Sequence, residues 1–158
     1  MKPVFVIVGI SEKPYTHLAS LRVHDKISYK YKNNELIHFS FLYNDKVSEY
    51  ANIERQCSQM SCIFNDSNTL YVVCITCNAL YTYIDYYKKC MSFSNVVVMN
   101  VIKIVCDYII NNQYRDIGII CTKLTKKSQI YNNCLSGNNI NIDYTTINNK
   151  DIDSHYLY

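Results

Sequence analysis

Residues 70–81 read LYVVCITCNALY, and this stretch does most to predict the fold. Its first half, Leu70–Ile75, is a continuous apolar run rich in β-branched residues, which is typical of a parallel strand buried on both faces. A helix is expected to begin directly after this strand, with Asn78 capping its first turn. Cys77 would then lie at the carboxyl end of a strand beside helix N–H groups, where a thiol pKa falls and where α/β sheets bind ligands. The alternative is that Cys77 is one more buried small residue among eight cysteines.

The same strand-to-helix pattern recurs along the rest of the chain. Strands are predicted over 4–8, 36–43, 70–75, 96–99, 117–121 and 140–144, and helices over 15–31, 47–64, 78–90, 101–113 and 125–134. Asn100 follows a predicted strand just as Asn78 does, and the apolar residues after it keep a helical spacing. Strands that alternate with helices predict an α/β fold, here a three-layer sandwich with a parallel sheet.

The composition excludes several classes of protein. The chain has 158 residues, which suit one domain or two small lobes, and no apolar run approaches the roughly 20 residues of a membrane-spanning helix. With 49% hydrophobic and 18% charged residues it is too apolar to be disordered. The net charge of +3 is spread without a basic cluster, unlike the surface of a nucleic-acid groove. Ile, Asn and Tyr make up about a third of the chain, which we interpret as the composition of an AT-rich genome.

The cysteines are expected to be reduced thiols in a cytoplasmic protein. The opening segment Met1–Gly9 has a single basic residue and no small-residue cleavage site, so it is interpreted as a buried strand and not as a signal peptide. Cys74 and Cys77 form a C-x-x-C, but zinc needs a second pair of ligands, and Cys57 with Cys62 is only a loose candidate. A thioredoxin-like dithiol is disfavoured because Cys74 falls within the strand. We therefore expect no metal, and no glycine-rich loop marks a phosphate-bearing cofactor.

A second turn of the same kind lies at 117–125, which reads IGIICTKLT. The predicted strand ends in hydroxyl groups just before a helix. The hydroxyls of Thr122 and Thr125 could donate to a carboxylate beside helix N–H groups, or they could form an ordinary helix cap, which is the default interpretation.

These segments, taken in order, resemble the aspartate/glutamate racemase family. The resemblance rests on Met1–Gly9 with Pro14, the Cys77-Asn78 turn, the helix from Asn100, and the run 118–125 followed by Tyr131. The family has a start of the kind Gly-x-Leu-Gly-Gly-Met, a Cys-Asn-Thr motif, and a later Thr-x-x-Thr motif with a tyrosine a few residues on. The resemblance covers nearly the whole chain at low identity.

The resemblance implies a two-lobed α/β protein that works without a cofactor. In the family two cysteines, one from each lobe, flank the substrate α-carbon, and one removes the proton while the other returns it to the opposite face. Cys77 matches the first of these cysteines. Asn78 matches a residue that helps to hold the substrate, and Thr122 and Thr125 match those that bind its carboxylate.

The departures from the family pattern put catalysis in doubt. The family's second cysteine belongs to a Gly-Cys-Thr-Glu-like motif that the sequence, ending at Tyr158, does not reach. The motif threonine is replaced by Ala79, and the glycine-rich first loop is eroded. We therefore expect a first racemase-like lobe over 1–113 and a truncated, incomplete second lobe over 114–158, with a sheet edge left open for a partner.

The sequence thus favours a degenerate, catalytically impaired racemase-like protein that acts through macromolecular interaction. The expected partner is a second copy of the chain in a homodimer, or another protein that covers the open lobe; a large acidic assembly such as a ribosome has no specific support, and no membrane is involved. The alternative is an active, cofactor-independent amino-acid racemase or isomerase. It would use Cys77 as base on an acidic amino acid and would be completed by a dimer partner.

Overall fold

The computed structural model describes residues 3–10, 35–42 and 44–147, which divide into two compact units. The first unit contains the described residues up to Cys77 together with Tyr83–Met99, and the second contains Asn78–Thr82 and the chain from Asn100 onward. The helix predicted over 15–31 lies outside the described residues. Each unit is described by itself below.

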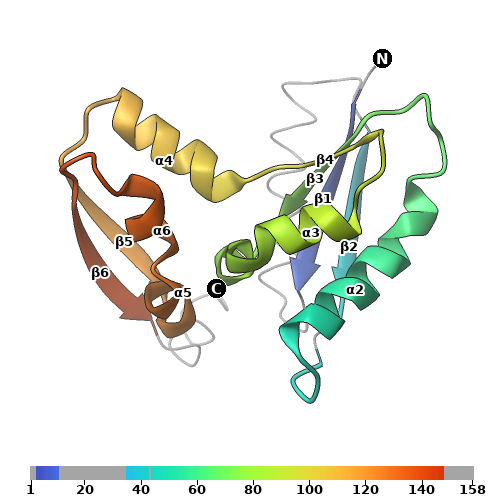
Figure 1. Cartoon of the computed structure of the whole chain (residues 1–158), viewed down its shortest axis with the longest axis horizontal. Coiled ribbons are helices and arrows are strands. Elements are labelled where there is room, and N and C mark those ends of the chain that lie inside the picture. Colours follow the sequence, from blue (N-terminus) through green and yellow to red (C-terminus); the bar gives the residue numbers. More distant parts are fainter. Residues whose placement is uncertain (1–2, 11–34, 43, 148–158) are drawn as a thin grey trace, which may run out of the picture. The chain divides into compact units, whose positions relative to one another are not determined.

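The first unit is built on a four-stranded parallel sheet (Figure 1). Its strands are β1 (Val4–Ile10), β2 (Leu36–Phe41), β3 (Tyr71–Ile75) and β4 (Val96–Val98), in the order β2-β1-β3-β4. β1 pairs with β2 on one side and β3 on the other, with Val6 opposite both Ile37 and Val73. The four strands predicted for this part of the chain are confirmed, and with them the α/β fold with a parallel sheet.

The two central strands carry the core of the first unit. Val6 and Val73 are fully buried, and Ile75 is almost so. A parallel strand that is buried on both faces has no solvent-facing side, so its sequence lacks polar alternation. That property made LYVVCI recognisable as a strand.

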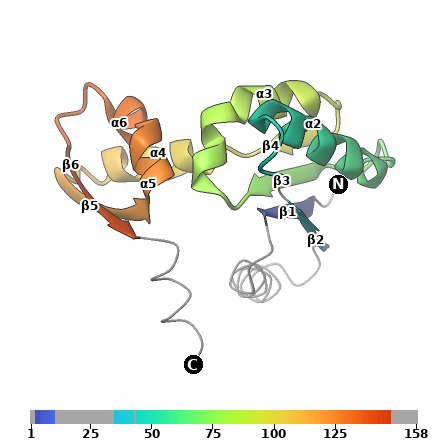
Figure 2. The same cartoon turned by 90° about the horizontal axis from the view of Figure 1, so that it is seen from below.

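The helices described in the first unit lie on one face of this sheet (Figure 2). They are α2 (Glu49–Met60), the short 3-10 segment η1 (Ser61–Ile63) and α3 (Ile84–Cys90), and α2 packs against α3. Ser48 caps α2 by accepting a hydrogen bond from the backbone N–H of Ala51 at 3.2 Å. Ile53 and Met60 of this helix are completely buried. The third layer of the expected sandwich depends on 15–31, outside the described residues.

The second unit pairs two parallel strands, β5 (Asp116–Thr122) and β6 (Asn141–Ile147), with three α-helices (Figure 1). The helices are α4 (Val101–Asn111), α5 (Lys123–Ser128) and α6 (Ile130–Leu135). α4 packs against α6, and Ile102 of α4 and Tyr131 and Leu135 of α6 are buried. α5 lies against both strands. The strands predicted at 117–121 and 140–144 are confirmed, each slightly longer than predicted.

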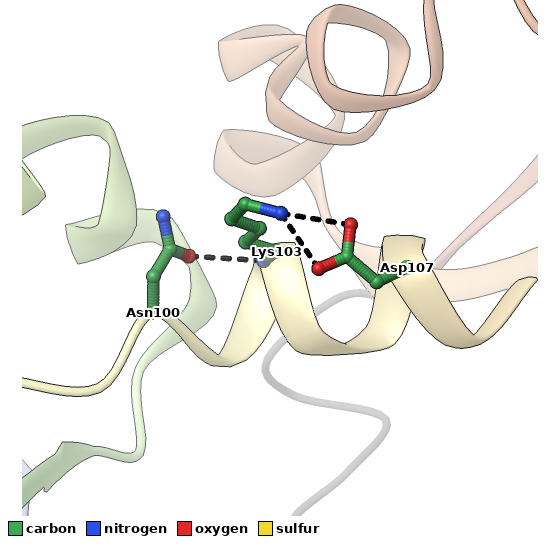
Figure 3. Close-up of polar contacts among 3 residues, drawn as sticks. All are labelled: Asn100, Lys103 and Asp107. Carbon is green, nitrogen blue, oxygen red and sulfur yellow. Dashed lines mark hydrogen bonds and ion pairs between the residues drawn. The ribbon is translucent and has the colours of Figure 1, made fainter. Parts of the chain in front are cut away.

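The start of α4 is stabilised locally (Figure 3). The side-chain oxygen of Asn100 accepts a hydrogen bond from the backbone N–H of Lys103 at 3.0 Å, as the sequence predicts for a capping residue. The Lys103 ammonium reaches Asp107 one turn later, at 2.6 Å. This i,i+4 ion pair is exposed to solvent and adds little to stability.

Two predicted helices differ from the structure. The helix predicted over 125–134 is two short helices, because Gln129 adopts a left-handed φ of +53° that ends α5 and starts α6. The Ser128 hydroxyl donates to the carbonyl of Thr125, which competes with helical pairing at the same place. The helix predicted over 78–90 begins as the 3-10 segment η2 (Asn78–Tyr83) and becomes α-helical only at Ile84.

The division into units also differs from the lobes that the sequence suggested. We expected one lobe over 1–113 and another over 114–158, which places α4 with the first. The contacts of the structure place α4 with the second unit, because α4 packs against α6.

Candidate functional site

Cys77 follows the carboxyl end of β3 and is half-buried. The residue before it is held firmly, because both the N–H and the hydroxyl of Thr76 donate to the carbonyl of Val8 in β1, at 2.9 and 3.0 Å. β1 and β3 are adjacent, and the connections from β1 to β2 and from β3 to β4 leave in opposite directions. Cys77 therefore lies just after the carboxyl end of β3, at the topological switch point between β1 and β3, where open α/β sheets bind their ligands.

A buried polar pair lies in the same unit. Tyr87 of α3 is fully buried, and its hydroxyl donates to the side-chain oxygen of Gln56 in α2. Burial, followed by the nearby thiols of Cys57 and Cys77, raises the pKa of Tyr87 far above its usual value. The phenol thus stays protonated, and it serves as a hydrogen-bond donor to Gln56 and not as a base.

Asn78 belongs to the second unit, where its amide donates to the hydroxyl of Tyr131 in α6 at 3.3 Å. Tyr131 is buried, and burial raises its pKa, so this hydroxyl is also neutral. The sequence predicted Asn78 as the cap of an α-helix. In the structure it begins the 3-10 segment η2, so no α-helix starts directly after Cys77.

Thr122 and Thr125 form a helix cap. The Thr122 hydroxyl oxygen accepts a hydrogen bond from the backbone N–H of Thr125 at 3.3 Å, and the two hydroxyls lie 3.2 Å apart. Thr125 is 3% exposed, so its hydroxyl faces the interior of the second unit. Of the two interpretations that the sequence left open, the structure shows the capping geometry; whether these hydroxyls also bind a carboxylate stays a prediction.

The four predicted site residues are distributed over the two units. Cys77 belongs to the first unit, whereas Asn78, Thr122 and Thr125 belong to the second. The pair formed by Gln56 and Tyr87 was not predicted from the sequence. Tyrosine and glutamine at helix positions give no pattern that separates a buried pair from an exposed one, so no sequence signal could have identified it.

The cysteines were also considered as metal ligands. Among residues 3–10, 35–42 and 44–147 there is no group of three or more His, Cys, Asp or Glu side chains that could hold a metal ion. All eight cysteines are free thiols. Of the loose pair considered for zinc, Cys57 is buried, whereas Cys62 is exposed and donates to the carbonyl of Gln59.

The comparison with known proteins identifies the fold. No family model matches the sequence, and no curated protein does. The structure is similar to that of the aspartate racemase of Picrophilus torridus, with a TM-score of 0.63 and 15% sequence identity. The match covers 96% of this chain and 64% of that protein, so this chain spans about two thirds of its length. The chain therefore has an aspartate racemase-like fold, as the motifs predicted.

The described part of the chain was also searched for membrane spans. It contains no helix that is both long enough and apolar enough to cross a bilayer.

Proposed function

We propose that this chain is a degenerate, catalytically impaired member of the racemase fold that acts by associating with another macromolecule. The observation that carries the proposal is the hydrogen bonding of the predicted ligand-binding side chains. The amide of Asn78 donates to the hydroxyl of Tyr131. The hydroxyls of Thr122 and Thr125 are hydrogen-bonded to each other, and the Thr122 hydroxyl also caps a helix by accepting from the backbone N–H of Thr125. Groups that are satisfied inside one unit support a structural role better than a role in holding a substrate carboxylate.

The local sequence supports the same conclusion. Ala79 stands where the family motif has a threonine, which removes one hydroxyl beside Asn78. The segment after Cys77 is 3-10 helical up to Tyr83, so the α-helix that the sequence predicted directly after this cysteine is not formed.

The second unit also exposes a row of large apolar side chains, which we call the α4 row. Its members are Ile104, Val105 and Tyr108 of α4 and Tyr114 just after it, all between 38% and 59% exposed. The tyrosine rings contact each other with centroids 6.2 Å apart. Ile102 and Cys106 are the buried residues of α4, so this helix carries exposed apolar side chains in addition to its buried ones. A continuous exposed apolar row is typical of an interface.

The proposed partner is a second copy of this chain. The α4 row is uncharged, and it would meet its own copy across a two-fold axis, which is the commonest arrangement of homodimers. Tyrosine is well suited to such a contact because it buries a large ring while keeping its hydroxyl near solvent.

Sedimentation tests this interface with one variant and a matched control. We expect the wild-type chain to dimerise at micromolar concentration and Tyr108→Asp to be monomeric, because it would bury a carboxylate in the contact. Leu124→Asp, the same kind of change at an apolar residue of α5 that is 58% exposed, should remain a dimer. A monomeric wild type, or equal loss in both variants, would exclude the α4 row as a self-association surface.

One observation favours the alternative of an active isomerase. Cys77 is half-buried at the switch point of the sheet and its backbone is fixed through Thr76. In this alternative the Cys77 thiolate takes the α-proton of an acidic amino acid, and a dimer partner supplies the group that returns a proton to the opposite face. It requires Cys77 to be alkylated at neutral pH faster than the exposed Cys62, as measured by fragment-ion mass spectrometry.

A further inference from the structure

The sheet of the second unit leaves one edge of β5 without a neighbouring strand. β5 pairs with β6 along its whole length, from Asp116 opposite Asn141 to Thr122 opposite Ile147. Within the described residues no strand pairs with the other edge of β5. The backbone N–H and C=O groups that point to this edge are therefore a template for pairing with a further strand.

The sequence of β5 is typical of a strand that has neighbours on both sides. Residues 117–121 read IGIIC, a run without the charge or proline that protects an open edge. In β6, by contrast, polar and apolar residues alternate over 141–145. The sheet of the first unit offers a comparison, because β1 pairs with β2 on one edge and with β3 on the other. Among the described strands, β5 lacks the second neighbour that β1 has.

The exposure of the side chains supports the same interpretation. Ile120 is 70% exposed, although it lies within this apolar run. Gly118 lies on the same face of β5, and no atom is found within 4 Å of the position that a Cβ would take there. This face of β5 thus combines an exposed apolar side chain with open space two residues away.

We propose that β5 pairs antiparallel with β5 of a second copy of this chain, which joins the two sheets into one of four strands. The inference rests on the self-association proposed above and specifies its backbone contact. A two-fold axis makes two identical edge strands antiparallel. One register pairs all seven residues of β5 with all seven of the other copy, and it places Ile119 opposite Ile119.

In this register β5 is complementary to itself. Ile120 lies opposite Gly118 of the second copy, where its side chain covers the open space above the glycine. Asp116, the charged residue of β5, lies opposite Thr122 and not opposite a like charge. The α4 row ends at Tyr114, two residues before β5 begins, so the strand contact follows this row directly along the chain. This self-complementarity argues for a second copy as the occupant of the edge.

Gly118→Val tests the register without removing a contact. The valine fits in the single chain because the space around its Cβ is open. Opposite Ile120 of the second copy it forms two symmetric cross-strand pairs, so the dissociation constant from sedimentation should fall about 2- to 30-fold. Asp143→Val is the matched control, since Asp143 is exposed and lies opposite Gly118 on β6. It should leave the dissociation constant unchanged.

Amide hydrogen exchange of the wild-type chain tests the pairing itself. Mass spectrometry compares residues 116–122 with residues 141–147 at concentrations above and below the dissociation constant. About three amides of β5 should be protected in the dimer and not in the monomer, because alternate residues of a strand point to each edge. β6 should show no such change, since its outer edge stays unpaired in both states.

The outcomes separate this inference from the self-association on which it rests. A wild-type chain that is monomeric at micromolar concentration would overturn both. The strand pairing alone would be overturned by a dimer whose β5 amides exchange equally in both states. It would also be overturned by a dissociation constant that Gly118→Val leaves unchanged or raises, or that Asp143→Val lowers to the same extent.

Discussion

Tyr87→Phe should destabilise the first unit by about 1–3 kcal/mol although it removes only one oxygen atom. The Tyr87 hydroxyl donates to Gln56, whose side chain is 1% exposed. Within the described residues the amide nitrogen of Gln56 has no hydrogen-bond partner. Loss of the phenol oxygen therefore leaves the whole glutamine amide buried without a partner, and the cost is its desolvation. Urea unfolding followed by circular dichroism measures the change.

A double-mutant cycle separates this cause from a packing defect. Gln56→Met keeps an unbranched side chain of similar volume and should by itself destabilise the protein, because it leaves the Tyr87 hydroxyl unpaired. The chain that carries both Tyr87→Phe and Gln56→Met should be more stable than the sum of the single changes allows, since neither polar group remains. Strict additivity of the two changes would show that the hydrogen bond does not couple these residues.

Raising the pH from about 9 to about 12 under reducing conditions should progressively unfold the chain. Burial raises the pKa of Cys57 and of Cys106 from 9.0 to about 12. In this range the unfolded chain has ionised both thiols while the folded chain still holds their protons. The folded state thus binds more protons, and stability falls as pH rises, by up to about 1.4 kcal/mol per pH unit for each thiol.

The control for this pH dependence replaces one buried thiol at a time. Cys57→Ala should lower the stability at neutral pH by leaving a small cavity and should make the alkaline slope shallower. Cys62→Ala, at an exposed position, should leave the slope unchanged. Equal slopes in the wild type and Cys57→Ala would show that the Cys57 thiol does not contribute to it.

The sheets could be predicted because their strands are continuous apolar runs. Val73 and Ile75 belong to a parallel strand that is buried on both faces. The sequence around them lacks the alternation of polar and apolar residues that is typical of a strand with one exposed face. The Asn100 cap was predictable for a similar reason, since capping depends on one side chain and the backbone three residues away.

The errors lie where tertiary contacts override local preference. Nothing in the residues 125–134 requires the left-handed φ at Gln129 that splits the predicted helix into α5 and α6. The α-helix predicted from Asn78 is replaced by a 3-10 segment that belongs to one unit while α3 belongs to the other. Local propensity cannot report such a division.

The candidate site was predictable only as a set of residue types in order. The motifs placed Cys77 at the end of a strand and the two threonines at the start of a helix. In the structure Cys77 follows β3, Thr122 caps α5, and Thr125 lies within that helix. Hydrogen bonding decides whether those groups face a ligand or each other. The hydrogen bond from the Asn78 amide to the Tyr131 hydroxyl joins residues 53 positions apart, and no local sequence pattern contains such a contact.

Proton–deuterium exchange at the α-carbon of L- and D-aspartate and glutamate tests the central claim most directly. The purified chain and its Cys77→Ala variant are compared in deuterated buffer by proton magnetic resonance, which detects the work of even one catalytic base. If the chain is a catalytically impaired racemase fold, the α-proton should exchange no faster with either protein present than in buffer alone. Exchange on either enantiomer that the wild type catalyses and Cys77→Ala does not would contradict the proposal and establish Cys77 as an active base.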